Sequence, residues 1–255
     1  MKWTWSWASF ASGVTAFTAV AALLFTGLSL QQTRAQNQLD ESGQITDRFN
    51  AAVTNLGSGT ETIRIGGILA LQRIMQDSRR DQPAVVEVLS AFVREHAPLP
   101  AADVVNYPTR FQPSRPAAIT ADTVPAIDVQ TALTVLAGRD SSQDQGSIVD
   151  LANTDLNGAS LQGAHLEDAN LQGAFLVSAD LADSDFGGAN LEDANLSDAD
   201  LLHADLSRAL LQNATFSGSV QLAKLNGAVL DDALMDSHSL CDGAVVARPE
   251  WGYQC

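Results

Sequence analysis

The side chains that could perform chemistry are few in this sequence, and they stand apart from one another. His165 and His203 are isolated at positions expected to face water, and we interpret each as a surface residue rather than a metal ligand. The chain has no P-loop, no GxSxG, no HExxH and no GxGxxG motif. We therefore expect that it is not an enzyme and that it has no catalytic residue, no cofactor-binding residue and no metal ligand. Its acid-rich stretches also lack the spacing of an EF-hand or of calcium-binding β-rolls, which leaves only weak calcium binding open.

The two cysteines, Cys241 and Cys255, both lie near the C-terminus. Two are too few for a disulfide framework, and no CxxC or Cys/His spacing indicates zinc. A bridge between them would form only if this end of the chain faces an oxidising compartment. The sequence therefore leaves their pairing open.

Negative charge dominates the composition. The chain has 30 acidic and 14 basic residues and a formal net charge of −16. Such a chain repels nucleic acid at long range, so we expect no nucleic-acid partner. Between Val149 and Val245, sixteen acidic residues stand against only two basic ones, Arg208 and Lys224.

A transmembrane helix is expected over residues 8–30. These 23 residues, ASFASGVTAFTAVAALLFTGLSL, are mostly apolar or small, and a spanning helix needs about 20. Trp3, Trp5 and Trp7 lie at the start of the segment, and indole rings favour the headgroup layer. A cleaved signal peptide is the alternative, although its cleavage site would have to include Arg34. The charges on the two sides are nearly balanced and do not fix the orientation.

Residues 43–97 are expected to form a helical domain, because apolar residues recur there with a helical period. Gly66 and Gly67 fall inside its second helix, where each costs about 1 kcal/mol relative to alanine. They are explained if a neighbouring helix crosses closely there, and otherwise by a local kink. Residues 98–125 hold six of the eight prolines and predict an extended linker, and a further helix is expected over 126–138. The apolar surface of these helices is expected to include Ile45, Phe49, Ala52, Val53, Leu56, Ile65, Ile68, Leu69, Ile74, Met75, Val85, Val86, Leu89, Phe92, Val93, Ile127, Val129, Leu133 and Leu136.

A period of five dominates residues 149–245. Leucine or phenylalanine occupies every fifth position from Leu151 to Phe216, and alanine stands two places before most of them. After a slip of one residue the pattern resumes at Val220. Five residues advance an α-helix by about 500°, so the leucines form no stripe, and in one long strand they would alternate between faces. A chain that turns a corner every five residues keeps all of them inside.

The pentapeptides ANLED, ANLSD, ADLLH and ADLSR resemble the A(D/N)LXX motif of the pentapeptide repeat family. This resemblance implies a mainly β solenoid over 149–245, a right-handed quadrilateral β-helix with four pentapeptides per coil. Residues twenty apart should then stack in four columns, of which one contains Leu151, Leu171, Leu191 and Leu211. The ends of such a stack need caps, and the helix at 126–138 and residues 246–255 are the candidates. Trp251 and Tyr253 either cover the last coil or contact a partner.

In some members of this family an acidic rod mimics duplex DNA and binds a type II topoisomerase. Here Glu167, Asp168, Asp183 and Glu192 fall on different sides of the expected rod. Charge that is spread around all sides favours solubility over one binding groove.

The helical segment, with RIGGILALQRI and VVEVLSAFVREHAP, also resembles the helical region of membrane-anchored pentapeptide repeat proteins of actinobacteria. Its helix pairs are similar to HEAT-type hairpins. We therefore expect a bacterial single-pass protein of the cell membrane that acts as a scaffold or protein–protein interaction module. Its soluble part is expected in the cytoplasm, where both cysteines stay reduced. The topoisomerase-binding DNA mimic and an exported cell-surface rod are the alternatives, and the sequence names neither the protein partner nor the oligomeric state.

Overall fold

The computed structural model describes residues 31–32, 36, 43–99, 124–217, 223–231 and 233–235. The chain divides into two compact units, residues 1–50 and residues 51–255. Across the described ranges, no helix is both long and apolar enough to cross a bilayer. The transmembrane helix predicted at 8–30, most of the predicted linker and the predicted C-terminal cap at 246–255 lie outside those ranges.

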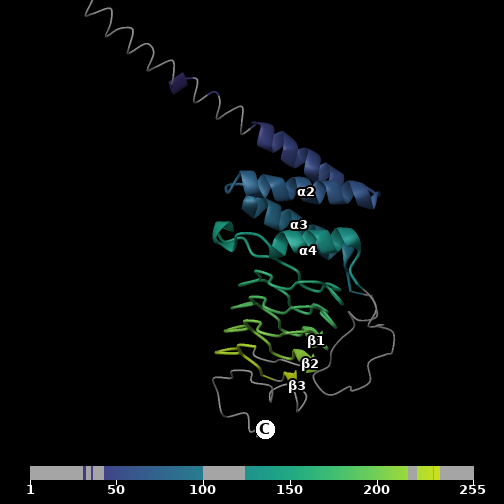
Figure 1. Cartoon of the computed structure of the whole chain (residues 1–255), viewed down its shortest axis with the longest axis vertical. Helices are drawn as coiled ribbons and strands as arrows, with labels where there is room; N and C mark the ends of the chain where they lie inside the picture. The colour runs from purple at the N-terminus through teal and green to yellow at the C-terminus, as the bar shows by residue number, and fades with distance from the viewer. Residues whose placement is uncertain are drawn as a thin grey trace, which may run out of the picture. The chain divides into compact units, whose positions relative to one another are not determined.

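The helical region of the second unit contains three named helices. They are α2 (Glu61–Asp77), α3 (Gln82–His96) and α4 (Ile127–Ala137), and all three pack on one another. A helix at 43–56 precedes them and ends at Gly57. Pro83 lies in the first turn of α3, where its missing N–H has no helical partner to lose. Figure 1 shows α4 as the helix next to the coils that follow.

The core of this region consists of apolar side chains at helical spacing. Most of the predicted inward-facing residues are buried, among them Ile68, Ile74, Met75, Val85, Val86, Leu89, Phe92, Val93, Val129, Leu133 and Leu136. Three predictions were wrong: Val53 is 37% exposed, Leu69 is 48% exposed and Ile127 is 67% exposed. Leu69 and Ile127 line a surface groove, described below, instead of the interior.

The two adjacent glycines of α2 have different surroundings. A Cβ atom on Gly67 would lie 2.7 Å from the carbonyl oxygen of Ala52, in the preceding helix. A Cβ atom on Gly66 would have no heavy atom within 4 Å. The predicted close helix crossing is therefore confirmed at Gly67 and absent at Gly66.

Residues after 149 form coils of twenty residues, which stack through parallel backbone pairs. Asp150 pairs with Asn170, and Asn170 in turn pairs with Asn190. The same step of twenty recurs on every side, in the pairs Asp155–Phe175, Ser160–Asp180, His165–Asp185, Phe175–Asn195, Asp180–Asp200, Asp185–Asp205 and Asn190–Leu210. Since the pairs recur every five residues along the chain, each coil has four sides. We name the four faces of the stack by their first leucine: the Leu151, Leu156, Leu161 and Leu166 faces.

The leucine columns fill the interior, as the period predicts. Leu151, Leu171, Leu191 and Leu211 are all buried, and so are the alanines two places before most of the inner residues. The longest strands lie on the Leu156 face: β1 (Asn195–Ser197), β2 (Thr215–Ser217) and β3 (Leu234–Met235) form one parallel sheet in that order.

The predicted slip of one residue appears as a change in the stacking step. Asn195 pairs with Thr215, twenty residues on, whereas Thr215 pairs with Leu234, nineteen residues on. Asp205–Lys224 and Leu210–Val229 have the same step of nineteen. The inner residues Leu225 and Leu230 remain buried, so the column continues through the shorter coil.

Candidate interaction surface

The corner of each side imposes a backbone conformation on one residue. In the described repeat up to residue 213, the second residue after each inner leucine or phenylalanine has a positive φ between 55° and 74°. The N–H of the following residue then donates to the carbonyl of the inner residue at many corners, for example Ala159 to Leu156 at 3.0 Å. This is the geometry of a turn whose third residue must be left-handed, which glycine, asparagine and aspartate tolerate best. The corner residues are mostly of these types: Asn153, Gly158, Gly163, Asp168, Gly173, Asp183, Gly188, Asp193, Asp198 and Asn213.

Where the residue before an inner leucine or phenylalanine is aspartate or asparagine, it has a second structural role. The carboxylate of Asp180 accepts a hydrogen bond from the backbone N–H of Ala182, two residues on, at 3.2 Å. Asp200 does the same for Leu202 at 3.0 Å, and Asn190 for Glu192 at 3.1 Å. Such bonds are the Asx-turns that make aspartate and asparagine favourable in turns. The same contact is made by Asp150, Asp155, Asn170, Asp185, Asn195 and Asp205.

These two positions account for most of the acidic residues of the rod. Six acids of residues 149–217 are Asx-turn residues: Asp150, Asp155, Asp180, Asp185, Asp200 and Asp205. Four more are left-handed corner residues: Asp168, Asp183, Asp193 and Asp198. Only Glu167 and Glu192 stand at neither position. These acids therefore have a structural role in the turns, whether or not their charge has a further use.

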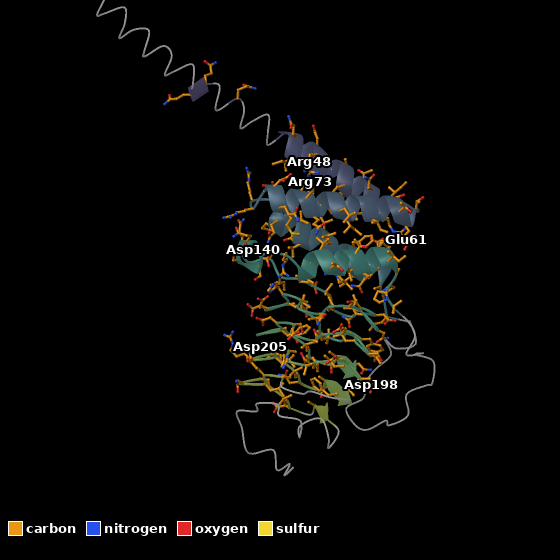
Figure 2. All side chains as sticks on the ribbon, in the orientation of Figure 1. Arg48, Glu61, Arg73, Asp140, Asp198 and Asp205 are labelled. Carbon is orange, nitrogen blue, oxygen red and sulfur yellow. The ribbon has the colours of Figure 1, made fainter. Side chains whose placement is uncertain are left out.

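The acidic residues are distributed around the stack. Figure 2 shows Asp198 and Asp205 on opposite sides of the coils. By their positions in the repeat, Asp198 lies on the Leu156 face and Asp205 on the Leu166 face, while Asp180 and Asp200 stack on the Leu161 face. This distribution agrees with the expectation of a charged, soluble surface and gives no single acidic groove.

The two basic residues of the rod lie on the Leu166 face, together with one of its histidines. Lys224 Nζ lies 2.9 Å from Asp205 Oδ2. Burial of the Asp205 carboxyl opposes its ionisation, but hydrogen bonds from Ser207 and Lys224 outweigh it and lower the pKa of Asp205. The hydrogen bond to Asp205 and the charge of that carboxylate raise the pKa of Lys224. The pair lies where the step of nineteen begins, so it joins the shorter coil to the one before it.

Both histidines of the repeat have exposed side chains, as their positions predict. His203 Nδ1 lies 3.2 Å from Asp183 Oδ1 of the preceding coil, and its side chain is 52% exposed. His165 Nδ1 lies 3.7 Å from Glu167 Oε1, and its side chain is 54% exposed. No group of three His, Cys, Asp or Glu side chains within the described ranges could hold a metal ion.

The helical region closes the N-terminal end of the coil stack. In later coils the backbone N–H of the residue before each inner leucine donates to a carbonyl of the preceding coil, as Asn170 N–H does to Val149 O at 2.9 Å. The first coil has no coil above it, and helical groups take its place on all four sides. The four contacts are Asp150 N–H to Ser90 Oγ at 3.3 Å, Asp155 N–H to Ala97 O at 2.8 Å, Ser160 N–H to Gln130 Oε1 at 3.0 Å and His165 N–H to Ala137 O at 3.0 Å.

Carbonyl groups at the same end also find donors. Gln130 Nε2 donates to Ser160 O at 2.8 Å, so the side-chain amide of Gln130 pairs with both the backbone N–H and the backbone carbonyl of Ser160. Arg94 Nη1 donates to Asp150 O at 2.7 Å, and Arg139 Nη1 donates to His165 O at 2.5 Å. No local pattern in the sequence predicts these contacts, because the residues involved are separated by 26 residues or more.

Buried ion pairs hold the helices in this capping position. Arg139 and Asp144 approach to 2.8 Å with side chains 2% and 10% exposed, and Gln82 Nε2 donates to Asp144 Oδ1 at 2.7 Å. Arg64 and Asp128 join α2 to α4 at 2.6 Å, with the Asp128 side chain 1% exposed. Because these charged groups are mostly buried, water cannot readily replace their partners, and the contacts hold the cap in one arrangement.

An open apolar groove of about 500 Å³ lies between the helices and the first coil. Leu69 of α2 and Ile127 of α4 line it, together with Val124, which is 73% exposed. Gly158 and Ser160 of the first coil complete one wall. The groove contains no titratable side chain, so it offers contact surface but no chemistry.

Comparison with known proteins identifies the repeat. The family model described as "Pentapeptide repeats (8 copies)" matches residues 149–183 and 179–218. No curated protein is significantly similar in sequence to the chain.

Several solved structures are similar to the repeat. One is HetL, a pentapeptide repeat protein involved in heterocyst differentiation regulation from the cyanobacterium Nostoc sp. strain PCC 7120. It shares 27% identity over 41% of this chain and 55% of its own, with a TM-score of 0.32. A second Nostoc PCC 7120 pentapeptide repeat protein shares 30% identity over 38% of this chain and 84% of its own, with a TM-score of 0.29.

QnrB1, a plasmid-mediated fluoroquinolone resistance protein, shares 12% identity over 39% of this chain and 70% of its own, with a TM-score of 0.21. Of the full length of HetL, the chain spans about half. All three TM-scores are below 0.5, so these superpositions carry no functional argument.

Proposed function

Because the chain belongs to the pentapeptide repeat family through residues 149–218, we propose that it is a non-enzymatic scaffold, a protein-interaction module held at the cell membrane. Pentapeptide repeat proteins are right-handed β-helices that serve as protein-interaction modules. One observation carries the proposal for this chain: the interior of the stack is filled by its leucine columns. A filled interior leaves the outer faces as the part of the repeat that can meet a partner.

The outer faces of the stack form a rigid surface. Backbone pairs join each coil to the next, and Asx-turns and corner hydrogen bonds fix the residues between them. A preorganised surface loses little conformational entropy on binding, which favours recognition of a protein surface. The cap of α4, Gln130 and Arg139 extends this order to the first coil.

The membrane part of the proposal rests on the sequence of residues 8–30. Their 23 mostly apolar residues supply the length of a spanning helix. The proposed orientation, with the repeat in the cytoplasm, rests on the resemblance to membrane-anchored actinobacterial proteins. Labelling Cys255 in intact cells with a membrane-impermeant thiol reagent tests it: labelling only after lysis is expected, and labelling of intact cells would place the repeat outside.

Site-specific photocrosslinking tests the interaction role. A photoreactive residue is placed at Gln162, Ser178, Arg208 or Gln212, one outward position for each face of the full chain in its native membranes. An interaction module gives a discrete protein adduct from one or two faces and none from the others. Adducts from no face, or equally from all four, would contradict a defined binding surface.

We do not extend the proposal to a DNA mimic that binds a type II topoisomerase. Ten of the twelve acids in residues 149–217 serve as turn residues, and they surround the stack. A supercoiling assay with the full chain measures this alternative directly. Inhibition or protection of gyrase at micromolar protein would revive it.

A further inference from the structure

The positive charges of the described coils lie on one face. Over residues 149–217 and 223–231, the Leu166 face carries both basic residues, Arg208 and Lys224. In the same coils, the other three faces carry aspartate or glutamate but no arginine or lysine. Two copies of this acidic chain repel each other through those three faces, whereas one Leu166 face can offer opposite charges to another.

Arg208 is not explained by the fold of its own coil. It stands at a corner with a φ of +62°, where glycine, asparagine and aspartate are favoured and a longer side chain is strained. The residue is exposed, and within the described part of the chain its guanidinium forms no ion pair and no hydrogen bond. A strained residue whose charge is unused within the fold is a candidate for a contact with another molecule.

The two ends of each side of the Leu166 face are chemically different. One end is the residue before the inner leucine or phenylalanine, and the other end is the corner residue three positions later. A twofold axis parallel to the stack, placed between two such faces, brings each coil opposite the same coil of the other copy with its ends exchanged. The residues that then face each other are His165 and Asp168, Asp185 and Gly188, Asp205 and Arg208, and Lys224 and Gly227. None of these pairs has like charges.

We propose that two copies of the chain associate through their Leu166 faces in this same-direction arrangement, with Asp205 of each copy paired with Arg208 of the other. Asp205 Oδ1 accepts the backbone N–H of Ser207 and Oδ2 contacts Lys224, so each carboxylate oxygen can still accept one more hydrogen bond. A reversed arrangement centred on the second coil would place Asp185 opposite Asp185 of the other copy, and like charges oppose it.

Glycines let the two faces approach. Gly188 and Gly227 stand directly above and below Arg208 in the column of corner residues, and neither has a side chain that would hold the copies apart. The four coils, about 4.8 Å apart, form a face only about 19 Å high and one coil side wide. Small interfaces belong to weak, reversible complexes, so we expect a dissociation constant in the micromolar range.

Sedimentation analysis of the purified full chain in detergent tests the proposal. Arg208→Asn removes the charge and supplies a residue that tolerates the corner conformation. Because one substitution removes both equivalent ion pairs of the dimer, we expect the dissociation constant to rise at least tenfold, while the urea unfolding midpoint stays equal or rises. An unmodified chain that stays monomeric at all concentrations, or a dissociation constant that Arg208→Asn leaves unchanged, would overturn the proposal.

Ser178→Asn is the matched control. Ser178 is an exposed corner residue of the Leu156 face with a φ of +57°, so the substitution changes the same backbone position on another face. We expect its dissociation constant to stay within twofold of the unmodified chain. A rise as large as that of Arg208→Asn would assign the effect to the corner conformation and contradict the proposed interface.

Thiol cross-linking tests the direction of the two copies. In the full chain with Cys241→Ser and Cys255→Ser, the variant Ser207→Cys places a thiol near the proposed axis, where it meets the same residue of the other copy. A short bismaleimide should therefore link two copies of the Ser207→Cys chain and should not link copies that carry Gln212→Cys on the Leu151 face. No dimer from Ser207→Cys, or equal amounts from both variants, would overturn the proposal and leave the Leu166 face to a different protein or to solvent.

Discussion

Replacing Arg139 by methionine tests whether the buried ion pair holds the cap on the first coil. Methionine keeps an unbranched apolar stem but removes the charge, in a side chain that is 2% exposed. Asp144, 10% exposed, would lose the two contacts from Arg139 at 2.9 and 2.8 Å and keep only the one from Gln82. The carbonyls of Leu136 and His165 would also lose their donor.

The expected loss is large, because one partner of a buried pair would remain charged and unpaired. Breaking such a pair from one side costs about 3–5 kcal/mol of unfolding free energy. The whole stability of a domain is only about 5–15 kcal/mol, so Arg139→Met should produce a clear shift of the urea unfolding midpoint. Removing the charge from both partners avoids an unpaired buried carboxylate, so Arg139→Met with Asp144→Leu should be less destabilising than Arg139→Met alone.

The assay is urea unfolding of the full chain followed by far-ultraviolet circular dichroism, with hydrogen exchange as the local readout. The N–H of His165 should exchange faster in Arg139→Met, because Ala137 is held beside it by the same cap. Lys224→Met serves as control, since it removes an ion pair from an exposed side chain and should change stability far less. A loss below about 1 kcal/mol for Arg139→Met, or a double variant less stable than the single one, would refute the reasoning.

Further predictions concern the backbone and the Lys224–Asp205 ion pair, whose two pKa values are shifted. Gly66→Ala should stabilise α2 by about 1 kcal/mol, whereas Gly67→Ala should destabilise it through the close helix crossing, as thermal unfolding will measure. Gly163 has a φ of +65° and open space where a Cβ would lie. Gly163→Ala should therefore lower the free energy of unfolding by about 1–2 kcal/mol, and Gly163→Asn should lower it less, which urea unfolding checks. The stability added by the Lys224–Asp205 pair should be present between about pH 4 and pH 10. It should be lost in acid as Asp205 protonates at its lowered pKa, and in alkali as Lys224 deprotonates at its raised pKa. A titration of the stability difference between the unmodified chain and Lys224→Met tests this, and a difference that persists below pH 2 would contradict it.

The stacking of the repeat could be predicted because a period of five is compatible with so few backbones. Neither a helix nor a strand keeps Leu151, Leu156 and Leu161 on one side, so a corner every five residues was the solution that remained. The slip after Phe216 was equally visible, and it appears as the step of nineteen at Thr215–Leu234.

The residues between the leucines were interpreted less well. The charge pattern predicts only a solubilising role for the aspartates, whereas the structure shows that Asp180 closes an Asx-turn and that Asp183 has the left-handed backbone conformation of a corner. A signal was present in the sequence, since glycine, asparagine and aspartate recur two places after the inner leucines. Ser178, His203 and Arg208 break that pattern at the same corners, and their positive φ follows from the stack instead of their own preference.

The cap and the groove could not be predicted from local patterns. Gln130 reaches Ser160, thirty residues on, and Arg139 reaches His165, twenty-six residues on, through contacts that depend on where α4 lies. Leu69 and Ile127 have the helical spacing of core residues, but the groove leaves them uncovered. Periodicity assigns a side chain to a face of its own helix, whereas burial depends on the neighbours that meet that face.

The coil of twenty residues also acts as a ruler for insertions and deletions. Adding twenty residues lengthens the rod by one spacing of about 4.8 Å and returns every later residue to its original face. Adding five residues instead moves every later residue by one face, so that Asp205 would leave the face it shares with His165. Length and facing can therefore change separately in this chain, and an insertion of one pentapeptide would redirect a binding surface without altering a single leucine of the core.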